Sequence, residues 1–293
     1  MTREALPVIQ GHPEDDRFGR DRQALRLPAF LKRSVGKGSA VRQVKRLLRE
    51  SGAVTVCEEA KCPNLAECFA AKTATFMLMG ENCTRACGFC AVGTARPEPL
   101  DPSEPERIAT SASALGLAHV VLTSVNRDDL DDGGAQHIRA TVLAIKRAMP
   151  NSDVEVLIPD FMGDMDAVRL VAQAPISVLN HNIETVPRLY RRVRPRAAYQ
   201  RSLNVLAAAR ACQPEIVTKS GLMVGFGESY DEVVGVMKDL KAVGVNILTI
   251  GQYLRPSIKH VPVVEYLRPD AYDAYRKIGR DIGFDEVFAG PFV

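Results

Sequence analysis

Residues 83–90 read CTRACGFC, in which Cys83, Cys87 and Cys90 follow the spacing Cys-x3-Cys-x2-Cys. An apolar run typical of a strand, residues 74–80, comes directly before them. A closed zinc site or a fully ligated iron–sulfur cubane needs four protein ligands. Three thiolates leave one coordination position free for a group that is not protein, as catalytic zinc sites do. The spacing therefore predicts an open metal site at the end of a strand.

This spacing, on a loop that follows a strand, resembles that of the radical S-adenosylmethionine (SAM) enzymes. The resemblance implies that Cys83, Cys87 and Cys90 form the catalytic centre and hold a [4Fe–4S] cluster. It also implies that SAM chelates the free iron through its amino and carboxylate groups.

The bulk composition is that of an ordinary globular protein. Of the 293 residues, 25% are charged and 46% are apolar. The net charge of +3, from 38 basic and 35 acidic residues, is too small to indicate nucleic acid or a membrane as the main partner. No apolar run approaches the roughly 18–20 residues that span a bilayer, and the first residues carry no apolar signal region. We therefore expect a cytoplasmic location.

Six of the seven cysteines lie between positions 57 and 90, which indicates metal-bound thiolates in a reducing compartment. The seventh, Cys212, lies in an apolar helical pattern, and we expect it to be a small buried residue.

A second set, Cys57, Cys62 and Cys68, has the spacing Cys-x4-Cys-x5-Cys and precedes the first strand. One structural zinc site would use four thiolates and leave two of the six unexplained. An electron-transfer ferredoxin needs four cysteines per cluster and no barrel of this size. Two clusters with three cysteines each account for all six.

Strands and helices alternate from residue 74 onward. The short apolar runs rich in β-branched residues are 76–79, 119–124, 154–158, 176–180, 216–224 and 246–250. Buried parallel strands have this composition because both of their faces are covered. Helical patterns lie between them, and capping boxes at Ser103/Glu106 and Ser229/Glu232 mark the beginning of two helices. Six such units predict an α/β fold, either a barrel or an open doubly wound sheet.

The positions of the polar segments favour the barrel. A barrel gathers its functional residues at the carboxyl ends of its strands, and polar or glycine-rich segments follow five of the six strands at 83–90, 124–129, 180–184, 225–228 and 251–253. We predict a partial (β/α)6 TIM-like barrel over 74–283, left open for a bulky substrate. Residues 1–25 are expected to be disordered, 26–73 to form an N-terminal extension with the second cysteine set, and 284–293 a short C-terminal extension.

The two cysteine sets, in this order and with these spacings, resemble the lipoyl synthase family over residues 27–293. The adjacent segments that match the family are VCEEA at 56–60, CPN at 62–64, TSVNRDDL at 123–130, DGG at 132–134, NHN at 180–182, ETV at 184–186 and KSGLMVG at 219–225.

The resemblance implies a radical SAM sulfurtransferase that makes the lipoyl cofactor. One electron, from a donor such as a ferredoxin or flavodoxin, leads to cleavage of SAM into methionine and a 5′-deoxyadenosyl radical. The radical takes hydrogen from C6 and C8 of an octanoyl-lysine on a carrier protein. Cys57, Cys62 and Cys68 then hold an auxiliary [4Fe–4S] cluster that donates the inserted sulfurs. The protein itself binds, orients and excludes water.

SAM needs polar partners for its ammonium, carboxylate and ribose groups. From their positions at the barrel mouth we choose four residues as partners of SAM: Ser124, Asn182, Glu184 and Arg194. We expect Arg194 to bind the SAM carboxylate and the backbone of Phe89 to contact the edge of the adenine. The alternative for each is a strand-end cap or ordinary surface polarity.

The segment 188–196 has five arginines in nine residues, and Arg201 follows shortly after. A solvated face is the default interpretation of such a run. Lipoyl carrier domains are generally acidic, so the resemblance suggests that Arg191, Arg192 and the basic helix at 42–49 receive that partner.

The chain departs from the family at its end. In the family, a Gly-Pro-aliphatic-Val segment precedes Arg-Ser-Ser-Tyr, whose serine is the fourth ligand of the auxiliary cluster. Here the sequence stops at residues 290–293, GPFV, so we expect a shortened C-terminal extension and assign no fourth ligand. The alternatives are a sulfur-inserting enzyme resembling biotin synthase, against which the upstream cysteine set argues, and a non-catalytic iron–sulfur carrier.

Overall fold

The computed structural model describes residues 26–32, 46, 54–55 and 75–293 of the chain. Several expectations lie outside the described residues: the disorder of residues 1–25, the ligands Cys57, Cys62 and Cys68, and all of the basic helix at 42–49 except Arg46. Among the described helices, none is long and apolar enough to cross a membrane.

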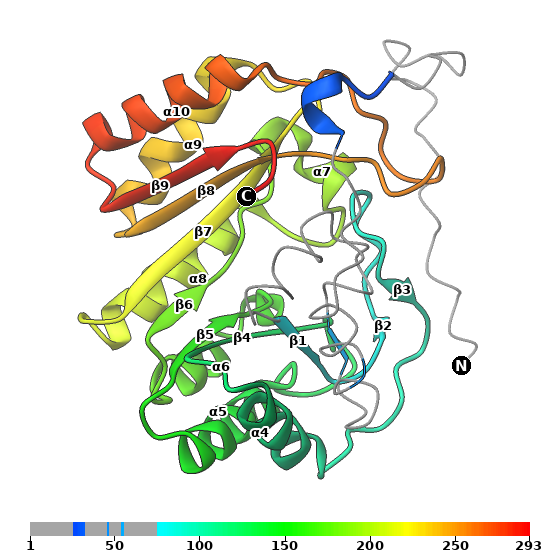
Figure 1. Ribbon diagram of the computed structural model, residues 1–293, viewed down its shortest axis with the longest axis vertical. Coiled ribbons are helices and arrows are strands. Elements are labelled where there is room, and N and C mark those ends of the chain that lie inside the picture. The colour runs from blue at the N-terminus through cyan, green and yellow to red at the C-terminus, as the bar shows by residue number, and fades with distance from the viewer. Residues whose placement is uncertain (1–25, 33–45, 47–53, 56–74) are drawn as a thin grey trace.

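The described part is built on one curved sheet of seven parallel strands (Figure 1). In spatial order these are β1 (Thr75–Leu78), β4 (His119–Ser124), β5 (Asp153–Leu157), β6 (Val178–Asn180), β7 (Val217–Val224), β8 (Ile247–Gln252) and β9 (Glu286–Gly290). All neighbouring strands pair in parallel. Within the described sheet β1 and β9 are its two edges, so the barrel is open, as predicted.

Helices cover the outer face of this sheet. They are α4 (Glu104–Leu115), α5 (Ala135–Ala148), α6 (Met165–Ala172), α7 (Tyr190–Val193), α8 (Tyr199–Cys212), α9 (Tyr230–Ala242) and α10 (Pro269–Ile282), with the 3-10 turns η2 (Ala29–Leu31), η3 (Phe161–Gly163) and η4 (Pro187–Leu189). Figure 1 shows α4, α5 and α6 beside one end of the sheet and α9 and α10 beside the other. The apolar core divides in the same way into two clusters. Two very short parallel strands, β2 (Asn82–Cys83) and β3 (Gly93–Thr94), flank the cysteine loop.

The two predicted helix starts have different outcomes. At α9 the capping box is formed, because the Ser229 hydroxyl accepts from the Glu232 amide at 3.2 Å and the Glu232 carboxylate accepts from the Ser229 amide at 2.8 Å. α4 also begins directly after Ser103, as predicted, but its capping box is not formed, because the Ser103 hydroxyl donates to Asp101 at 2.7 Å instead.

The carboxyl-terminal residues join the sheet. The sequence assigned 284–293 to an extension beyond the barrel, whereas 286–290 form β9 and pair with β8. Val287 and Ala289 are buried against α10 and its neighbours, while Phe288 between them is 51% exposed. This alternation has the period of a strand with one covered face, but five residues are too few to stand out in the sequence. Cys212 also differs from expectation, because it is half-buried at the end of α8.

Candidate active site

A cavity of about 800 Å³ lies at the carboxyl ends of the strands. Its wall includes every described residue that the sequence selected for the site: Cys83, Cys87, Phe89, Cys90, Ser124, Asn182, Glu184 and Arg194. These residues come from the loop after β2 and from the ends of β4 and β6 and the segment that follows α7. The fold therefore gathers them as the barrel prediction required. The second cysteine set lies outside the described residues.

The three thiols have unequal surroundings. The Cys83 sulfur accepts backbone hydrogen bonds from Arg85 at 3.4 Å and from Asn126 at 3.3 Å, and the Asn126 amide side chain lies 3.8 Å away. Burial raises the pKa of the Cys87 thiol to about 11 and that of Cys90 to about 12. Thiols in such a site ionise when a metal supplies positive charge.

Three cysteine thiols lie on the wall of this cavity. In a cubane each cysteine binds a different iron, so a set of three thiolates suits a [4Fe–4S] cluster with one iron left for another ligand. Within the described ranges no group of three Cys, His, Asp or Glu side chains is placed to hold a single metal ion.

The cysteine loop is held from three sides. The Gly88 amide donates to the Val193 carbonyl at 2.9 Å, and the Gly88 carbonyl accepts from the Val261 amide at 2.8 Å. His260 Nε2 donates to the Cys90 carbonyl at 2.9 Å. The third anchor is the end of β4, where the Thr84 amide donates to the Asn126 carbonyl at 3.1 Å. Backbone hydrogen bonds to three other segments, together with the His260 side chain, thus hold the loop in place.

Glu184 reaches the cavity through an uncommon backbone conformation. Its φ of +66° lies in the left-handed region, which costs a non-glycine residue about 1–3 kcal/mol. Two hydrogen bonds at 2.9 Å hold it there: its amide donates to the Gly221 carbonyl, and its carbonyl accepts from the Met223 amide. Burial raises the pKa of the Glu184 carboxyl, although Arg194 opposes this rise.

Gly221 makes room for this arrangement. A side-chain carbon at that position would lie 2.4 Å from the Thr249 hydroxyl and 2.9 Å from the Asn182 amide oxygen. The absence of a side chain on β7 therefore lets Asn182 approach the strand closely.

Two polar groups on the cavity wall are buried without a hydrogen-bond partner in the described structure, namely Ser124 Oγ and Arg194 Nε. Arg194 is otherwise anchored, since its Nη1 donates to the Asn182 carbonyl at 2.9 Å. Buried polar groups in folded proteins are nearly always paired. Because both residues line the cavity, these two atoms are candidates for hydrogen bonds to a polar ligand bound there.

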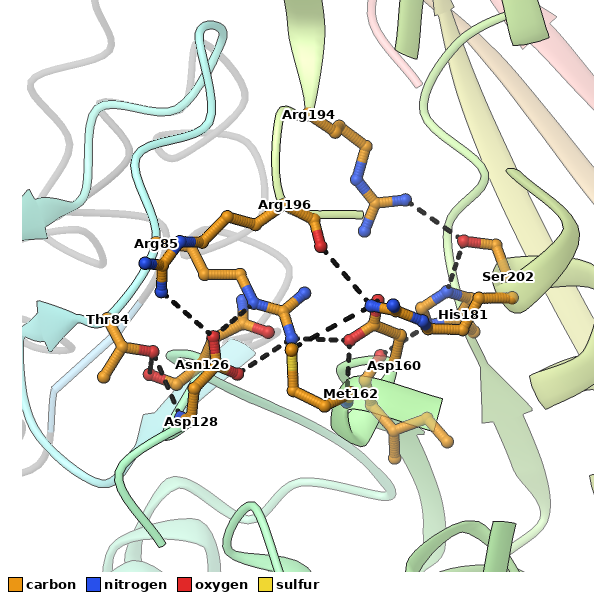
Figure 2. Close-up of polar contacts among 12 residues, drawn as sticks. Thr84, Arg85, Asn126, Asp128, Asp160, Met162, His181, Arg194, Arg196 and Ser202 are labelled. Carbon is orange, nitrogen blue, oxygen red and sulfur yellow. Dashed lines mark hydrogen bonds and ion pairs between the residues drawn. The ribbon is translucent and has the colours of Figure 1, made fainter. Parts of the chain in front are cut away.

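His181 and Arg194 both lie beside the Ser202 hydroxyl (Figure 2). The hydrogen-bond partners of His181 determine which of its ring nitrogens carries the proton. Its Nδ1 must donate to the Ile158 carbonyl at 2.9 Å, because a carbonyl only accepts. In the neutral ring Nε2 is then an acceptor, and it lies 3.0 Å from the Ser202 hydroxyl. Burial lowers the pKa of His181 to about 4, so the ring is neutral at pH 7. Ser202 Oγ also lies 3.5 Å from Arg194 Nη1.

The arginine-rich segment separates into distinct roles. Arg188 pairs with Glu232 at 2.7 Å, Arg201 pairs with Asp160 at 3.1 Å, and Arg194 lines the cavity. Arg191 is exposed to solvent. The structure therefore does not support one continuous basic face.

Sequence reasoning missed several residues around the cavity: Arg85, Asp160, His181 and His260. Asp160 follows β5, the one strand end at which no polar segment was noted. The same barrel rule would have selected it, and His181 lies inside the NHN segment already quoted. No comparable signal marks His260.

Comparison with known families agrees with this geometry. Residues 77–240 match the family described as the radical SAM superfamily, and residues 11–62 match the N-terminal domain of lipoyl synthase. The chain is 50% identical over 292 residues to the lipoyl synthase of Rubrobacter xylanophilus, which covers 99% of this chain and 91% of the relative. It is 51% identical over 269 residues to that of Caldanaerobacter subterraneus, which covers 92% of this chain and 94% of the relative.

Solved structures share the fold at low sequence identity. SuiB from Streptococcus suis, bound to S-adenosylmethionine, matches 78% of this chain and 53% of its own with a TM-score of 0.59 and 10% identity. Methylornithine synthase matches 73% of this chain and 70% of its own with a TM-score of 0.53 and 12% identity. At these identities the likeness shows a common architecture of parallel strands and helices.

Proposed function

The chain belongs to the lipoyl synthase family of the radical SAM superfamily, and from this premise we propose a role for each part of the cavity. A lipoyl synthase inserts sulfur at C6 and C8 of a protein-bound octanoyl-lysine, and its cofactors are SAM and two [4Fe–4S] clusters. When bound, SAM and the first cluster supply a radical able to break unactivated C–H bonds, for which acid–base side chains have no equivalent.

In our proposal Cys83, Cys87 and Cys90 hold the SAM-binding cluster. Arg194 binds the SAM carboxylate through its unpaired Nε, and Ser124 donates its unpaired hydroxyl to the same ligand. The observation that carries the proposal is the convergence of three thiols and these two unpaired groups on one cavity wall.

Three further residues complete the proposed SAM site. Glu184 accepts from the ammonium or ribose hydroxyl groups, Asn182 bonds beside it, and Phe89 offers its backbone to the adenine. In support, all three line the cavity, and Glu184 is held in its left-handed conformation by hydrogen bonds to β7.

We further propose that Cys57, Cys62 and Cys68 hold the auxiliary cluster that donates sulfur. In support, the match to the N-terminal domain of lipoyl synthase extends over residues 11–62 and includes the first two of these cysteines. The fourth ligand of this cluster stays unassigned.

Lipoyl synthases act on lipoyl carrier domains, and we propose that an acidic carrier domain docks beside exposed Arg191 and its neighbour Arg192, with a ferredoxin or flavodoxin as electron donor. Reversing both charges, Arg191→Glu and Arg192→Glu, should raise the apparent KM for the carrier because electrostatic attraction brings the partners together. An unchanged KM at low salt would contradict this docking site.

Anaerobic reconstitution tests the proposed clusters. The wild-type chain should bind about eight irons, release 5′-deoxyadenosine from SAM with dithionite, and add two sulfurs to an octanoyl-lysyl peptide, measured by mass. Replacing Cys83, Cys87 and Cys90 with alanine should remove about four irons and all SAM cleavage.

The complementary triple variant of Cys57, Cys62 and Cys68 should keep SAM cleavage and lose sulfur insertion. If wild-type protein instead binds about four irons and cleaves no SAM, the chain is an iron–sulfur carrier and the proposal fails.

A further inference from the structure

Charged side chains form a network around Arg85 of the cysteine loop, and Figure 2 shows Arg85 with Asp128, Asp160 and Arg196. Arg85 makes two hydrogen bonds to the Asp128 carboxylate, at 2.7 and 2.8 Å, and a third to Asp160 at 2.6 Å. Asp160 also accepts from Arg201 at 3.1 Å. The Arg85 and Asp160 side chains are 3% and 0% exposed. Arg196 pairs with the other side of Asp128 at 3.9 Å. The group is therefore an ionic network of three arginines and two aspartates whose centre, Arg85 and Asp160, is buried.

Four of these side chains come from different segments. Arg85 lies inside the cysteine loop, Asp128 follows β4, Asp160 follows β5, and Arg201 lies on α8. Arg201 also donates to the Arg196 carbonyl at 3.4 Å, two residues beyond Arg194. Asp160 is thus bonded on one side to the cysteine loop and on the other to the helix that supports the Arg194 segment.

The contacts of this network hold its side chains in place, because breaking one would leave a buried charge without a partner. Burial alone would raise the pKa of Asp160, but hydrogen bonds from Arg85 and Arg201 outweigh it and lower the pKa to about 2. Burial likewise disfavours the charged form of Arg85, and the bonds to Asp128 and Asp160 still raise its pKa above the ordinary value. A guanidinium bound at two edges has little freedom to rotate.

The position of this network matters for the ligand of the cavity. SAM must reach the iron held by the cysteine loop and the guanidinium of Arg194 at the same time, so the separation of these two elements sets how well it fits. Asp160 bonds to both supports through charged partners, Arg85 and Arg201, at 2.6 and 3.1 Å. Asp128 makes a second and longer link between them, since it pairs with Arg85 at 2.7 Å and with Arg196 at 3.9 Å.

We propose that Asp160 is a positioning residue that fixes the cysteine loop and the Arg194 segment relative to each other, so that the two ends of SAM are bound together. This inference rests on the proposed SAM site. It assigns to Asp160 no contact with SAM or with the cluster, because Asp160 is fully buried and does not line the cavity.

The test uses reconstituted full-length protein with Asp160→Asn, Arg201→Met and the double variant. The Kd for SAM is measured by anaerobic equilibrium dialysis and divided by the fraction of chains that carry the cluster, judged from iron content. Asp166→Asn is the matched control. It removes the charge of an aspartate whose side chain is 90% exposed and which pairs with Arg169 on α6.

We expect Asp160→Asn to raise the Kd for SAM about 10-fold or more, the usual effect of losing an outer partner of a ligand. Arg201→Met should raise it in the same direction, and Arg201→Lys should restore part of the affinity. The double variant should match Asp160→Asn within about 2-fold, because both residues act through one contact. Asp166→Asn should leave the Kd unchanged.

If Asp160 had a purely structural role, Asp160→Asn would lower the cluster content and the midpoint of thermal unfolding. The chains that carry the cluster would still bind SAM with the wild-type Kd. That result, or effects of the two substitutions that multiply, would overturn the inference. If Asp160→Asn fails to fold, the Kd for SAM of Arg201→Met tests the inference instead. A wild-type Kd in that variant would also overturn the inference. Wild-type protein that binds no SAM would instead reject the proposed site itself.

Discussion

His181 is a buried histidine whose neighbours hold it neutral. The Ile158 carbonyl accepts a hydrogen bond from Nδ1 of His181, and burial lowers the pKa of His181 from 6.5 to about 4. Between these two values the unfolded chain binds a proton that the folded chain does not, so stability must fall as pH decreases through this window.

We expect this group to contribute about 2–3 kcal/mol of pH dependence between pH 6.5 and 4. The free energy of unfolding, from urea titrations at several pH values, should fall over this range in wild-type protein. The slope should be smaller in His181→Gln, which keeps a polar side chain and does not titrate. Equal slopes in the two proteins would show that His181 is not the group responsible.

At this scale the sequence found the residues that face the cavity but not those that hold them. Ser124, Asn182, Glu184 and Arg194 were selected by their positions relative to strands, and all four line the cavity. Asp160 pairs with Arg85, which is 75 positions away in the chain. One sequence contains no signal for such a pairing, because the two residues meet only after the sheet has curved.

At the scale of elements, the glycines of α9 and α10 have opposite surroundings. A side-chain carbon on Gly279 of α10 would lie 2.6 Å from Val287 on β9 and 3.0 Å from Met237, whereas one on Gly235 of α9 would meet nothing within 4 Å. The close approach of α10 to β9 therefore depends on Gly279.

Gly235→Ala should stabilise the protein by about 0.5–1 kcal/mol, since alanine favours the helix over glycine. Gly279→Ala gains the same propensity but must displace Val287, so we expect net destabilisation of about 1–3 kcal/mol. Urea unfolding of the two variants side by side measures both. Stabilisation by both substitutions would mean that β9 is not packed against α10 as described.

The two helix starts give a second matched pair. Ser229→Ala removes a capping box that is formed and should lower the free energy of unfolding by about 1 kcal/mol. Ser103→Ala removes no cap from α4 and should change it by less than about 0.5 kcal/mol. Chemical denaturation distinguishes these values, and a larger loss at Ser103 would contradict the structure.

The elements themselves were largely predictable from periodicity. All six expected strands are present, and their ends differ from the expected bounds by at most two residues. Two local patterns were misjudged for a common reason. The hydroxyl of Ser103 had a nearer acceptor in Asp101, and β9 is recognisable as a strand only beside β8, so in both cases the neighbouring segment decided the outcome.

At the scale of the whole molecule, the open edge at β1 is partly covered by the chain that precedes it. Thr55 forms an antiparallel bridge with Phe76, and the Val54 carbonyl accepts from the Met77 amide at 2.9 Å. Val54 and Thr55 thus add backbone pairing to β1, an edge strand of the described sheet. No pattern in the sequence predicts this contact, because it joins segments about twenty residues apart.

A polar layer joins four strands beneath the cavity. Glu155 on β5 lies 2.9 Å from Lys219 on β7, 3.1 Å from Asn180 on β6 and 3.5 Å from His119 on β4. Leu157, two residues along β5 and therefore on the same face, lines the cavity. Burial would raise the pKa of Glu155, but the three partners outweigh it and lower the pKa from 4.5 to about 2.

Because the pKa of Glu155 is lowered in the folded state, its contribution to stability is present above pH 4.5 and disappears as pH falls towards 2. Glu155→Gln should therefore lower the free energy of unfolding by about 2–3 kcal/mol at neutral pH and by progressively less below pH 4.5. Asp153→Asn is the control, since this aspartate is exposed on the same strand and should matter by less than about 0.5 kcal/mol.

The effect of Glu155 is separable from that of His181 because the two pH windows overlap only near pH 4. If the free energy of unfolding of Glu155→Gln were lower than that of wild-type protein by the same amount from pH 7 down to pH 3, the substitution would act through packing and not through charge. A loss that becomes smaller only below pH 4.5 would show that the charge of Glu155 helps to hold β4, β5, β6 and β7 together beneath the cavity.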